Sequence, residues 1–370
     1  MLIQPYPHLK GGHCGSGALR DLMSWAGLGW DGELSEGLVF TLGGALDFAY
    51  LRADAINPPI YLVGRGGDLE VDLLRRLGAK TELRQTEDPD LGWKWVRTEL
   101  DSGRPVMVWA DIAELPYLRV RLRMSRHDIV IVGYDDEARD AYIVDNDRDE
   151  IQTVSYDALA RARASTGFPT PTRHATYIVD WPSDVPDLPS MAAAALEQSA
   201  ATLKHGGPSS IAAPASNGVS GTGLDGVRRF AEDVSRWPDI FGNEDLEAVL
   251  RSLAAFIEKA GTGGGLFRRL IAQGCVDLAD YTRNPKVHAA ARAARLAAQS
   301  WTRLAHIAVS DETPSRRSVQ VARHAAVLPE LEETLAVNRP GFRSVLEARM
   351  EHDEPEVLSR DARARAADAR

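Results

Sequence analysis

Hydrophobic and polar positions follow two different periods along the chain. After Cys14, apolar residues recur every three or four positions, at Leu19, Leu22, Met23 and Ala26, which is the spacing of one buried helix face. Apolar runs bounded by turn residues instead predict strands, at 58–64, 104–112, 127–136, 140–146 and 175–181. The first half of the chain is therefore expected to mix helices with strands.

The second half has a different pattern. PSDVPDLPS (182–190) holds three prolines and marks a boundary. Beyond it Ala, Leu, Arg and Glu dominate, and we find no strand pattern. An apolar stripe through 244–261 and strong helix formers at 288–308 predict helices, while 206–222 is expected to be a mobile loop.

These patterns predict an α+β fold with two domains. Residues 1–183 are expected to form the mixed N-terminal domain, and residues 184–350 a mainly α-helical C-terminal domain. The remaining segment, 351–370, is rich in Arg, Asp, Glu and Ala and is expected to be a flexible tail.

Composition narrows the class of protein. The formal net charge of −10 argues against nucleic-acid binding, because no basic field draws in phosphates. No apolar run approaches the roughly 20 residues that cross a bilayer, and the N-terminus lacks the pattern of a signal peptide. The two cysteines, Cys14 and Cys275, lie in different regions and suggest no disulfide. We therefore expect a cytoplasmic protein without a membrane partner.

Cys14 stands at the start of the first predicted helix, between the glycines of GGHCGSG (11–17). A helix N-terminus lowers the pKa of a thiol, and a nucleophilic cysteine needs a base and a group that orients the base. His127 opens one predicted strand and Asp145 closes the next, so hairpin pairing would bring them to neighbouring positions. This order of Cys, His and Asp is that of papain-like enzymes. The pattern predicts Cys14 as nucleophile, His127 as base and Asp145 as its orienting group.

Other interpretations of this segment are weaker. A lone cysteine is usually a core residue, but the glycines, the helix start and the downstream His and Asp favour catalysis here. Adjacent His13 and Cys14 have poor geometry for a shared zinc ion, and we expect no metal. GHCGS lacks the final glycine of a nucleophile elbow, which disfavours Ser16 as the nucleophile.

Several segments together resemble the N-terminal domain of the butirosin-biosynthesis protein H family. They are GGHCGSGALRDLM, LSEGLVFTLGGALDFAYL, GRPVMVWADIAELPY and HDIVIVGYDDEARDAYIVD. GTGGGLFRRLIAQ (261–273) resembles the domain of unknown function that often follows it. The resemblance implies a papain-like cysteine fold, related to bacteriocin-processing peptidases. In the founding member's pathway, the enzyme transfers an aminoacyl group from a carrier-protein thioester to an aminoglycoside amine. Carried over by motif, the resemblance implies the same roles: Cys14 as nucleophile, His127 as base and Asp145 as the group that orients the base.

We therefore expect an amide-forming acyltransferase of secondary metabolism. It would move an acyl or aminoacyl group from a thioester, through Cys14, to an amine, in an intermolecular transfer or a cyclisation. The donor is expected to be a phosphopantetheine-linked thioester on an acyl carrier protein, or a small thioester, and the chain binds no cofactor of its own. A cysteine hydrolase with the same three residues, either thioesterase or peptidase, is the alternative. A non-catalytic binding protein is disfavoured, and a homo-oligomer is compatible with the sequence.

The groups that would stabilise an oxyanion are the least defined part of the expected site. Related peptidases place a glutamine about six residues before the cysteine, and this chain has His8 there. The Cys14 backbone N–H remains, with His8, His13 and Ser16 as candidate side chains for the oxyanion or the substrate.

Further charged residues are candidates for binding partners. Glu36 and Asp47 would hold a cationic acceptor, although each could equally cap a helix or pair with an arginine. Four arginines before His127 would dock an acidic carrier protein or its phosphopantetheine phosphate, although a solvated edge is also compatible with them. They are Arg119, Arg121, Arg123 and Arg126. GTGGGLF (261–267) lacks the Lys-Ser/Thr pair of a nucleotide-binding loop and is expected to be a turn packed against the first domain.

Overall fold

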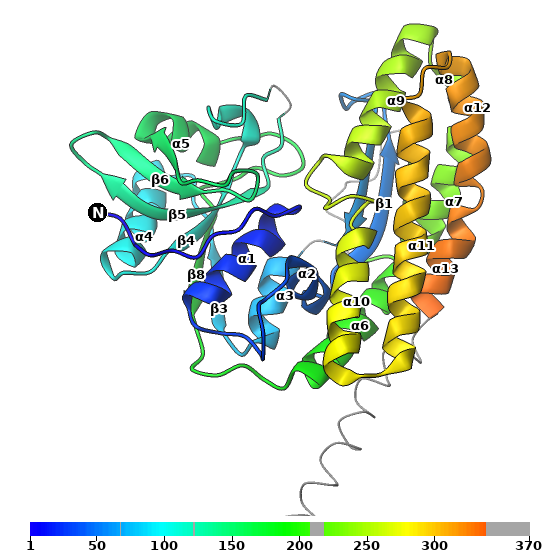
Figure 1. Ribbon diagram of the computed structural model, residues 1–370. Helices are drawn as coiled ribbons and strands as arrows, with labels where there is room; N and C mark the ends of the chain where they lie inside the picture. The colour runs from blue at the N-terminus through cyan, green and yellow to red at the C-terminus, as the bar shows by residue number, and fades with distance from the viewer. Residues whose placement is uncertain (67, 121–122, 208–217, 338–370) are drawn as a thin grey trace, which may run out of the picture.

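The computed structural model describes residues 1–66, 68–120, 123–207 and 218–337. Within these ranges the chain is an α+β protein with two antiparallel sheets, one of six strands and one of three (Figure 1). The predicted tail at 351–370 and Arg121 lie outside the described residues.

The six-stranded sheet is formed entirely by the first half of the chain. In spatial order its strands are β3 (Lys80–Arg84), β8 (Thr176–Asp180), β4 (Val106–Ala110), β5 (His127–Asp135), β6 (Asp140–Val144) and β7 (Gln152–Ser155). The strands predicted at 104–112, 127–136, 140–146 and 175–181 are confirmed as members of this sheet. Sequence reasoning missed β3 and β7, which carry charged or polar side chains at the two edges.

Helices cover both faces of this sheet. Apolar residues of α4 (Pro89–Asp101) and α5 (Tyr156–Arg163) pack on one face, against Val108, Ile129 and Ile143. The opposite face receives α1 (Cys14–Trp25) and α3 (Leu69–Arg76), and belongs to a second core that continues into the C-terminal helices. The alternation of strand side chains explains why Val130 and Ile131 belong to different cores.

The three-stranded sheet joins the two halves of the chain. Its central strand is β1 (Leu46–Arg52), with β2 (Ile60–Arg65) on one side and β9 (Val219–Thr222) on the other. Figure 1 shows β1 among the yellow and orange C-terminal helices. The expectation that no strand follows residue 183 is wrong, because the short Gly- and Ser-containing β9 pairs with β1. The domain limit at 183/184 stays a prediction.

The second half is otherwise helical. Its helices are α6 (Leu188–His205), α7 (Gly223–Val234), α8 (Trp237–Ile240), α9 (Asn243–Glu258), α10 (Arg268–Thr282), α11 (Pro285–Ala308), α12 (Pro314–Ala325) and α13 (Leu328–Val337). In the described part of the chain, no helix has the length and apolar character needed to cross a membrane.

A close helix crossing fixes the second half against the segment that leads into Cys14. In α10, a Cβ on Gly274 would lie 2.3 Å from the carbonyl oxygen of Gly37 in α2 (Glu36–Leu42). Only glycine allows the two backbones to approach this closely. Because Glu36 begins α2 and also bonds the loop before Cys14, the crossing holds this loop in a fixed position relative to α10.

Candidate active site

Cys14 is the first residue of α1, and His13 is the N-cap of that helix. The backbone N–H of Ser16 donates to His13 Nδ1 over 3.1 Å, which satisfies one of the amides that a helix start leaves without an intrahelical partner. The N–H of Cys14 is another such amide. The helix start therefore presents the thiol and a backbone N–H without an intrahelical partner at the same residue.

Glu36 holds the loop that precedes the thiol. Its carboxylate accepts the N–H of Gly12 and the N–H of His13, each over 2.7 Å, and the hydroxyl of Ser16 over 3.0 Å. Glu36 and Ser16, predicted as substrate-binding candidates, are thus engaged with this loop. Neither Glu36 nor Ser16 is among the described residues that line the cavity next to Cys14. Charge-assisted bonds to two successive amides fix the path of the backbone into Cys14.

The glycines beside Cys14 make room for protein groups. A Cβ on Gly12 would lie 2.6 Å from the Cα of Gly263 in the C-terminal half. A Cβ on Gly15 would lie 2.1 Å from Glu70 Oε1. The nucleophile segment therefore needs glycine at both positions, because backbone on one side and a buried carboxyl group on the other occupy the space.

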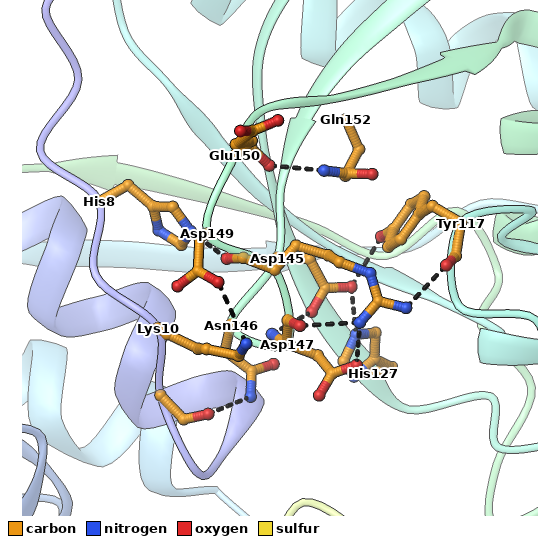
Figure 2. A network of polar contacts seen from close by, with 12 residues as sticks. His8, Lys10, Tyr117, His127, Asp145, Asn146, Asp147, Asp149, Glu150 and Gln152 are labelled. Carbon is orange, nitrogen blue, oxygen red and sulfur yellow. Dashed lines mark hydrogen bonds and ion pairs between the residues drawn. The ribbon is translucent and has the colours of Figure 1, made fainter.

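His127 and Asp145 meet as the predicted hairpin requires. β5 and β6 pair antiparallel with Val130 opposite Val144, which places His127 and Asp145 as diagonal neighbours. His127 Nε2 donates to Asp145 Oδ2 over 2.8 Å. Asp145 Oδ2 also accepts the hydroxyl of Tyr117 over 2.7 Å, and Figure 2 shows the tyrosine and histidine side chains converging on this carboxylate. Tyr117 is a site residue that sequence reasoning did not single out.

The thiol and the imidazole shift each other's protonation. Burial is the largest influence on Cys14 and raises its pKa, but the hydrogen bond and charge of His127, with the charge of Arg65, outweigh burial and lower the pKa. Burial is also the largest influence on His127 and lowers its pKa, but Asp145 and Cys14 together raise it well above its ordinary value. The structure thus favours a thiolate–imidazolium pair, the reactive form of a catalytic cysteine.

Asp145 stays ionised in this arrangement. Burial raises its pKa, but the charge and hydrogen bond of His127, the hydroxyl of Tyr117 and the N–H of Asp147 lower it to about 2. The N–H of Asp147 donates to Asp145 Oδ1 over 3.0 Å, so both carboxylate oxygens are fixed. A carboxylate held in this way can orient the imidazole and stabilise its positive charge.

Cys14 and His127 open onto a cavity of about 780 Å³ between the two halves of the chain. The first half contributes the loop Gly11–Cys14, together with Arg65, Arg126 and Asn146. The second half contributes Phe256, Lys259, the segment Gly261–Gly264, Phe267 and Arg269. The volume is that of a pocket for a small-molecule substrate. The predicted turn at 261–267 does pack against the first domain, since Gly263 donates its N–H to the carbonyl of Gly12.

His13 and His8 differ in what they can offer to a substrate. His13 lines the cavity, and burial followed by the charge of Arg65 lowers its pKa to about 3, so the ring is neutral. Because Nδ1 accepts from Ser16, the ring proton lies on Nε2, which has no hydrogen-bond partner among the described residues. His8 instead bonds Asp21 through Nδ1 and the carbonyl of Arg148 through Nε2, each over 2.7 Å. Both of its ring nitrogens are engaged in structural contacts.

Asp47 lies in the cavity wall, as predicted for an acceptor-binding residue. Burial raises its pKa to about 6, although the N–H groups of Phe48 and Gly207 act against burial. Its Oδ1 accepts from Phe48 over 2.7 Å, and its Oδ2 from Gly207 over 3.2 Å. Asp47 is therefore a carboxyl group that gains or loses its proton near neutral pH inside the cavity.

Of the four predicted docking arginines, the three that the structure describes do not share one surface. Arg119 and Arg123 are exposed, and Arg123 lies near Glu114 with 3.5 Å between Nη2 and Oε1. Arg126 turns inward, with 12% of its side chain exposed, and pairs with Glu70 over 3.3 Å. Its guanidinium also lies over the ring of Trp109, at 4.9 Å from the ring centroid. Arg126 therefore belongs to the cavity wall, whereas Arg119 and Arg123 are exposed, and carrier docking at these positions stays a prediction.

Sequence reasoning missed a charged cluster near Cys14. It consists of two buried acidic residues, Glu70 and Asp128, and two arginines of the cavity wall, Arg65 and Arg126. Glu70 lies in the first turn of α3, where an acidic residue is ordinarily expected at the surface. No spacing signal in the sequence distinguishes it from such a residue.

Comparison with known protein families gave two matches, and no curated protein matched the chain. Residues 13–146 match the model for Butirosin biosynthesis protein H, N-terminal, a region that includes Cys14, His127 and Asp145. Residues 157–338 match the Domain of unknown function (DUF4872). The resemblance drawn from the sequence motifs is thereby confirmed: the first part of the chain matches the butirosin biosynthesis protein H N-terminal family, and the second part matches the DUF4872 family.

Proposed function

We propose that the protein is a cysteine-dependent acyltransferase that forms an amide from a thioester and an amine. The observation that carries this proposal is the placement of Cys14, paired with His127 and Asp145, at a cavity that both halves of the chain enclose. The family name also supports a role in antibiotic biosynthesis, and so in secondary metabolism. The papain-like fold belongs to the same proposal.

The reaction divides into two steps. In the first, the Cys14 thiolate attacks the thioester carbonyl, and the donor thiolate leaves with a proton from the His127 imidazolium. In the second, the acceptor amine attacks the acyl–Cys14 thioester and gives a proton to neutral His127. The amide then leaves, and Cys14 returns as the thiolate. Asp145 keeps the imidazole oriented and stabilises its charge in both steps.

Two donors from the helix start that carries Cys14 would stabilise the tetrahedral intermediate. They are the backbone N–H of Cys14 and the Nε2–H of His13. They would replace the glutamine that related peptidases place before the cysteine. Asp47, which also lines the cavity, would bind the ammonium form of an acceptor.

A groove beside the cavity would receive an acidic donor protein. It lies between α10 and α11 and is lined by Arg269, Arg295, Arg303 and His306, with no acidic side chain among the described residues around it. Arg269 lines both this groove and the cavity. In a chain of net charge −10, such a local cationic surface favours an acyl carrier protein with acidic helices.

Intact-protein mass spectrometry tests the reaction. After incubation with N-acetylcysteamine thioesters of several acyl groups, we expect an acyl adduct on the wild type and on Cys275→Ala, and none on Cys14→Ala. Cys275 is a matched control because burial raises its pKa to about 12. Amines should discharge the adduct faster than water does. Discharge by water alone would indicate a hydrolase, and an adduct retained in Cys14→Ala would refute the proposal.

A further inference from the structure

A buried carboxyl group lies within hydrogen-bond distance of the Cys14 sulfur. Asp128 follows His127 on β5, and its Oδ2 lies 3.8 Å from Cys14 Sγ. Asp128 is 1% exposed, and it is absent from the described residues around the cavity. Its other oxygen, Oδ1, is buried without a hydrogen-bond partner in the described part of the protein. A charge on such a group would be poorly solvated.

A second buried carboxyl group lies next to Asp128. Glu70 is fully buried, and a Cβ at Gly15 would lie 2.1 Å from Glu70 Oε1 and 3.2 Å from Asp128 Oδ2. The two carboxyl groups therefore press against the same backbone position at the start of α1. Two negative charges this close together and away from water oppose each other's ionisation. One of the two carboxyl groups therefore keeps its proton.

The surrounding charges determine which carboxyl group keeps that proton. Glu70 pairs with Arg126 over 3.3 Å and with Arg65 over 3.5 Å. Asp128 has no guanidinium within ion-pair distance among the described residues. The charged and titratable groups that face it come from α1, α3, β2, β8 and the residue before β5, and they are Cys14, Glu70, Arg65, Tyr177 and Arg126. The ionised partner is thus Glu70, and the protonated one is Asp128.

The count of buried charges leads to the same assignment. The three positive charges of Arg65, Arg126 and His127 match the three negative charges of Glu70, Asp145 and Cys14, with both arginines paired to Glu70 and His127 paired to Asp145. An additional charge on Asp128 would be left without a counter-ion, and an unpaired buried charge is strongly destabilising. Burial, the charge of Glu70 and the charge of Cys14 all raise the pKa of Asp128.

One proton could reside on either the sulfur or Asp128. A negative charge on the sulfur faces the His127 imidazolium, Arg65 and the start of α1, all of which stabilise it. A negative charge on Asp128 faces Glu70 instead. The charge therefore belongs on the sulfur and the proton on Asp128.

We propose that Asp128 is a neutral carboxylic acid that donates a hydrogen bond from Oδ2 to the Cys14 thiolate. It supports the nucleophile from inside the protein, while His127 faces it from the cavity side. The proposal rests on the proposed function only in that Cys14 is the reactive sulfur. Asp128 would lower the pKa of the thiol and hold Sγ in position, and it would transfer no proton to the substrate.

The pH dependence of Cys14 alkylation by iodoacetamide tests this role without any acyl substrate. All variants carry Cys275→Ala, so that Cys14 is the only thiol. Asp128→Leu removes the donor and should raise the thiol pKa by about one unit, which slows alkylation about tenfold below that pKa. Asp128→Asn keeps a neutral N–H donor of the same shape, so its thiol pKa should stay close to that of the protein with Asp128. Thermal unfolding of each variant checks that it is folded.

An ionised Asp128 would give the opposite result. Both Asp128→Asn and Asp128→Leu would then lower the thiol pKa and speed alkylation, because each removes a repelling charge, and this outcome overturns the proposal. Equal alkylation profiles in all three proteins overturn it as well. If the profiles follow the proposal but no thioester acylates Cys14, the proposed acyl transfer fails and the assignment of Asp128 stands.

Infrared spectroscopy gives a direct second measurement. The difference spectrum between the Cys275→Ala protein and its Asp128→Asn variant should contain the carbonyl stretch of a protonated carboxylic acid near neutral pH. A difference spectrum that contains only carboxylate bands would overturn the proposal, even if the alkylation rates agree with it.

Discussion

The N–H of Gly263 donates to the carbonyl oxygen of Gly12 over 3.0 Å, two residues before Cys14. This bond connects the glycine-rich segment of the C-terminal half to the nucleophile loop. The backbones can approach this closely because neither residue has a side chain, and a Cβ on Gly12 would lie 2.6 Å from the Cα of Gly263. The C-terminal half thus forms one wall of the cavity and also helps to position the thiol.

Gly12→Ala should reduce acyl transfer strongly, because backbone at Gly263 must move to admit the methyl group. A displacement of about 1 Å at a reacting group can cost about 10²-fold in rate. Single-turnover acylation by a small thioester measures the effect. Gly242→Ala is the matched control, since φ there is −61° and, apart from its chain neighbours, no described residue has a heavy atom within 4 Å of the added Cβ. Equal losses in both variants would contradict a specific role for the Gly12–Gly263 contact.

The pH profile of acylation should be bell-shaped and set by the Cys14–His127 pair. Activity rises as Cys14 loses its proton, at a pH below that of an ordinary thiol, and falls as the imidazolium loses its proton, above the pH of an ordinary imidazole. Asp145→Asn removes the charge that raises the pKa of His127, so the alkaline limb should move to lower pH. Asp145→Leu also removes the orienting acceptor and should lower kcat further. An unmoved alkaline limb in Asp145→Asn would contradict this electrostatic role.

His8 should contribute pH-dependent stability. Its pKa is raised: burial acts to lower it, but the bonds to Asp21 and to the Arg148 carbonyl outweigh burial. A raised folded-state pKa means that the stabilisation is fully present below the pKa of the unfolded chain, about 6.5, and is lost as pH rises through the folded-state value. Urea unfolding of wild type and His8→Gln across this range should show a stability difference that shrinks with rising pH. A difference that grows with pH would contradict the assignment.

Local patterns predicted the elements that carry Cys14, His127 and Asp145, because a helix start and a hairpin are encoded by neighbouring residues. Apolar runs also predicted four of the six strands in the larger sheet. β9 escaped prediction because its order comes from pairing with β1, about 170 residues earlier in the chain. Long-range partners of this kind leave no period in the local sequence.

The roles of buried polar residues were harder to predict for the same reason. Glu36 looked like a pocket residue, yet it accepts the amides of Gly12 and His13. Glu70 and Asp128 looked like ordinary polar positions of a helix and a strand, and only the fold brings them behind Cys14. Composition and spacing therefore singled out Cys14, His127 and Asp145, which the fold brings to one site, but not the groups that hold them in position.

Carrier docking should depend on the groove between α10 and α11. Arg303→Glu places a negative charge in the groove and should raise KM about tenfold or more for a carrier-bound thioester, with little effect on a small thioester. Arg292→Glu is the matched control, because Arg292 is also exposed on α11 but is absent from the described lining of the groove. Equal effects of the two variants would point to net charge and contradict docking at the groove.

The buried Arg268–Glu332 pair should be a major support of the cavity wall. Both side chains are fully buried, with 2.8 Å between Nε and Oε1, and Arg268 also donates to the carbonyls of Asp47, Gly64 and Leu266. Arg268→Leu leaves the buried Glu332 carboxylate with Trp301 Nε1 as its described partner. This variant should lower the free energy of unfolding by about 3–5 kcal/mol, because a buried charge is left without its counter-ion.

Replacing both partners separates the buried charge from the lost packing. Arg268→Leu combined with Glu332→Leu should recover part of the lost stability in urea unfolding, because no unpaired charge remains. The exposed Arg229–Asp225 pair is the control, and Arg229→Leu should change stability far less. If adding Glu332→Leu to Arg268→Leu lowers the free energy of unfolding as much as Glu332→Leu does alone, the two residues are not coupled as described. Recovered stability without recovered acylation would show that Arg268 also positions the segment that ends at Phe267, whose ring lies 5.5 Å from that of His13.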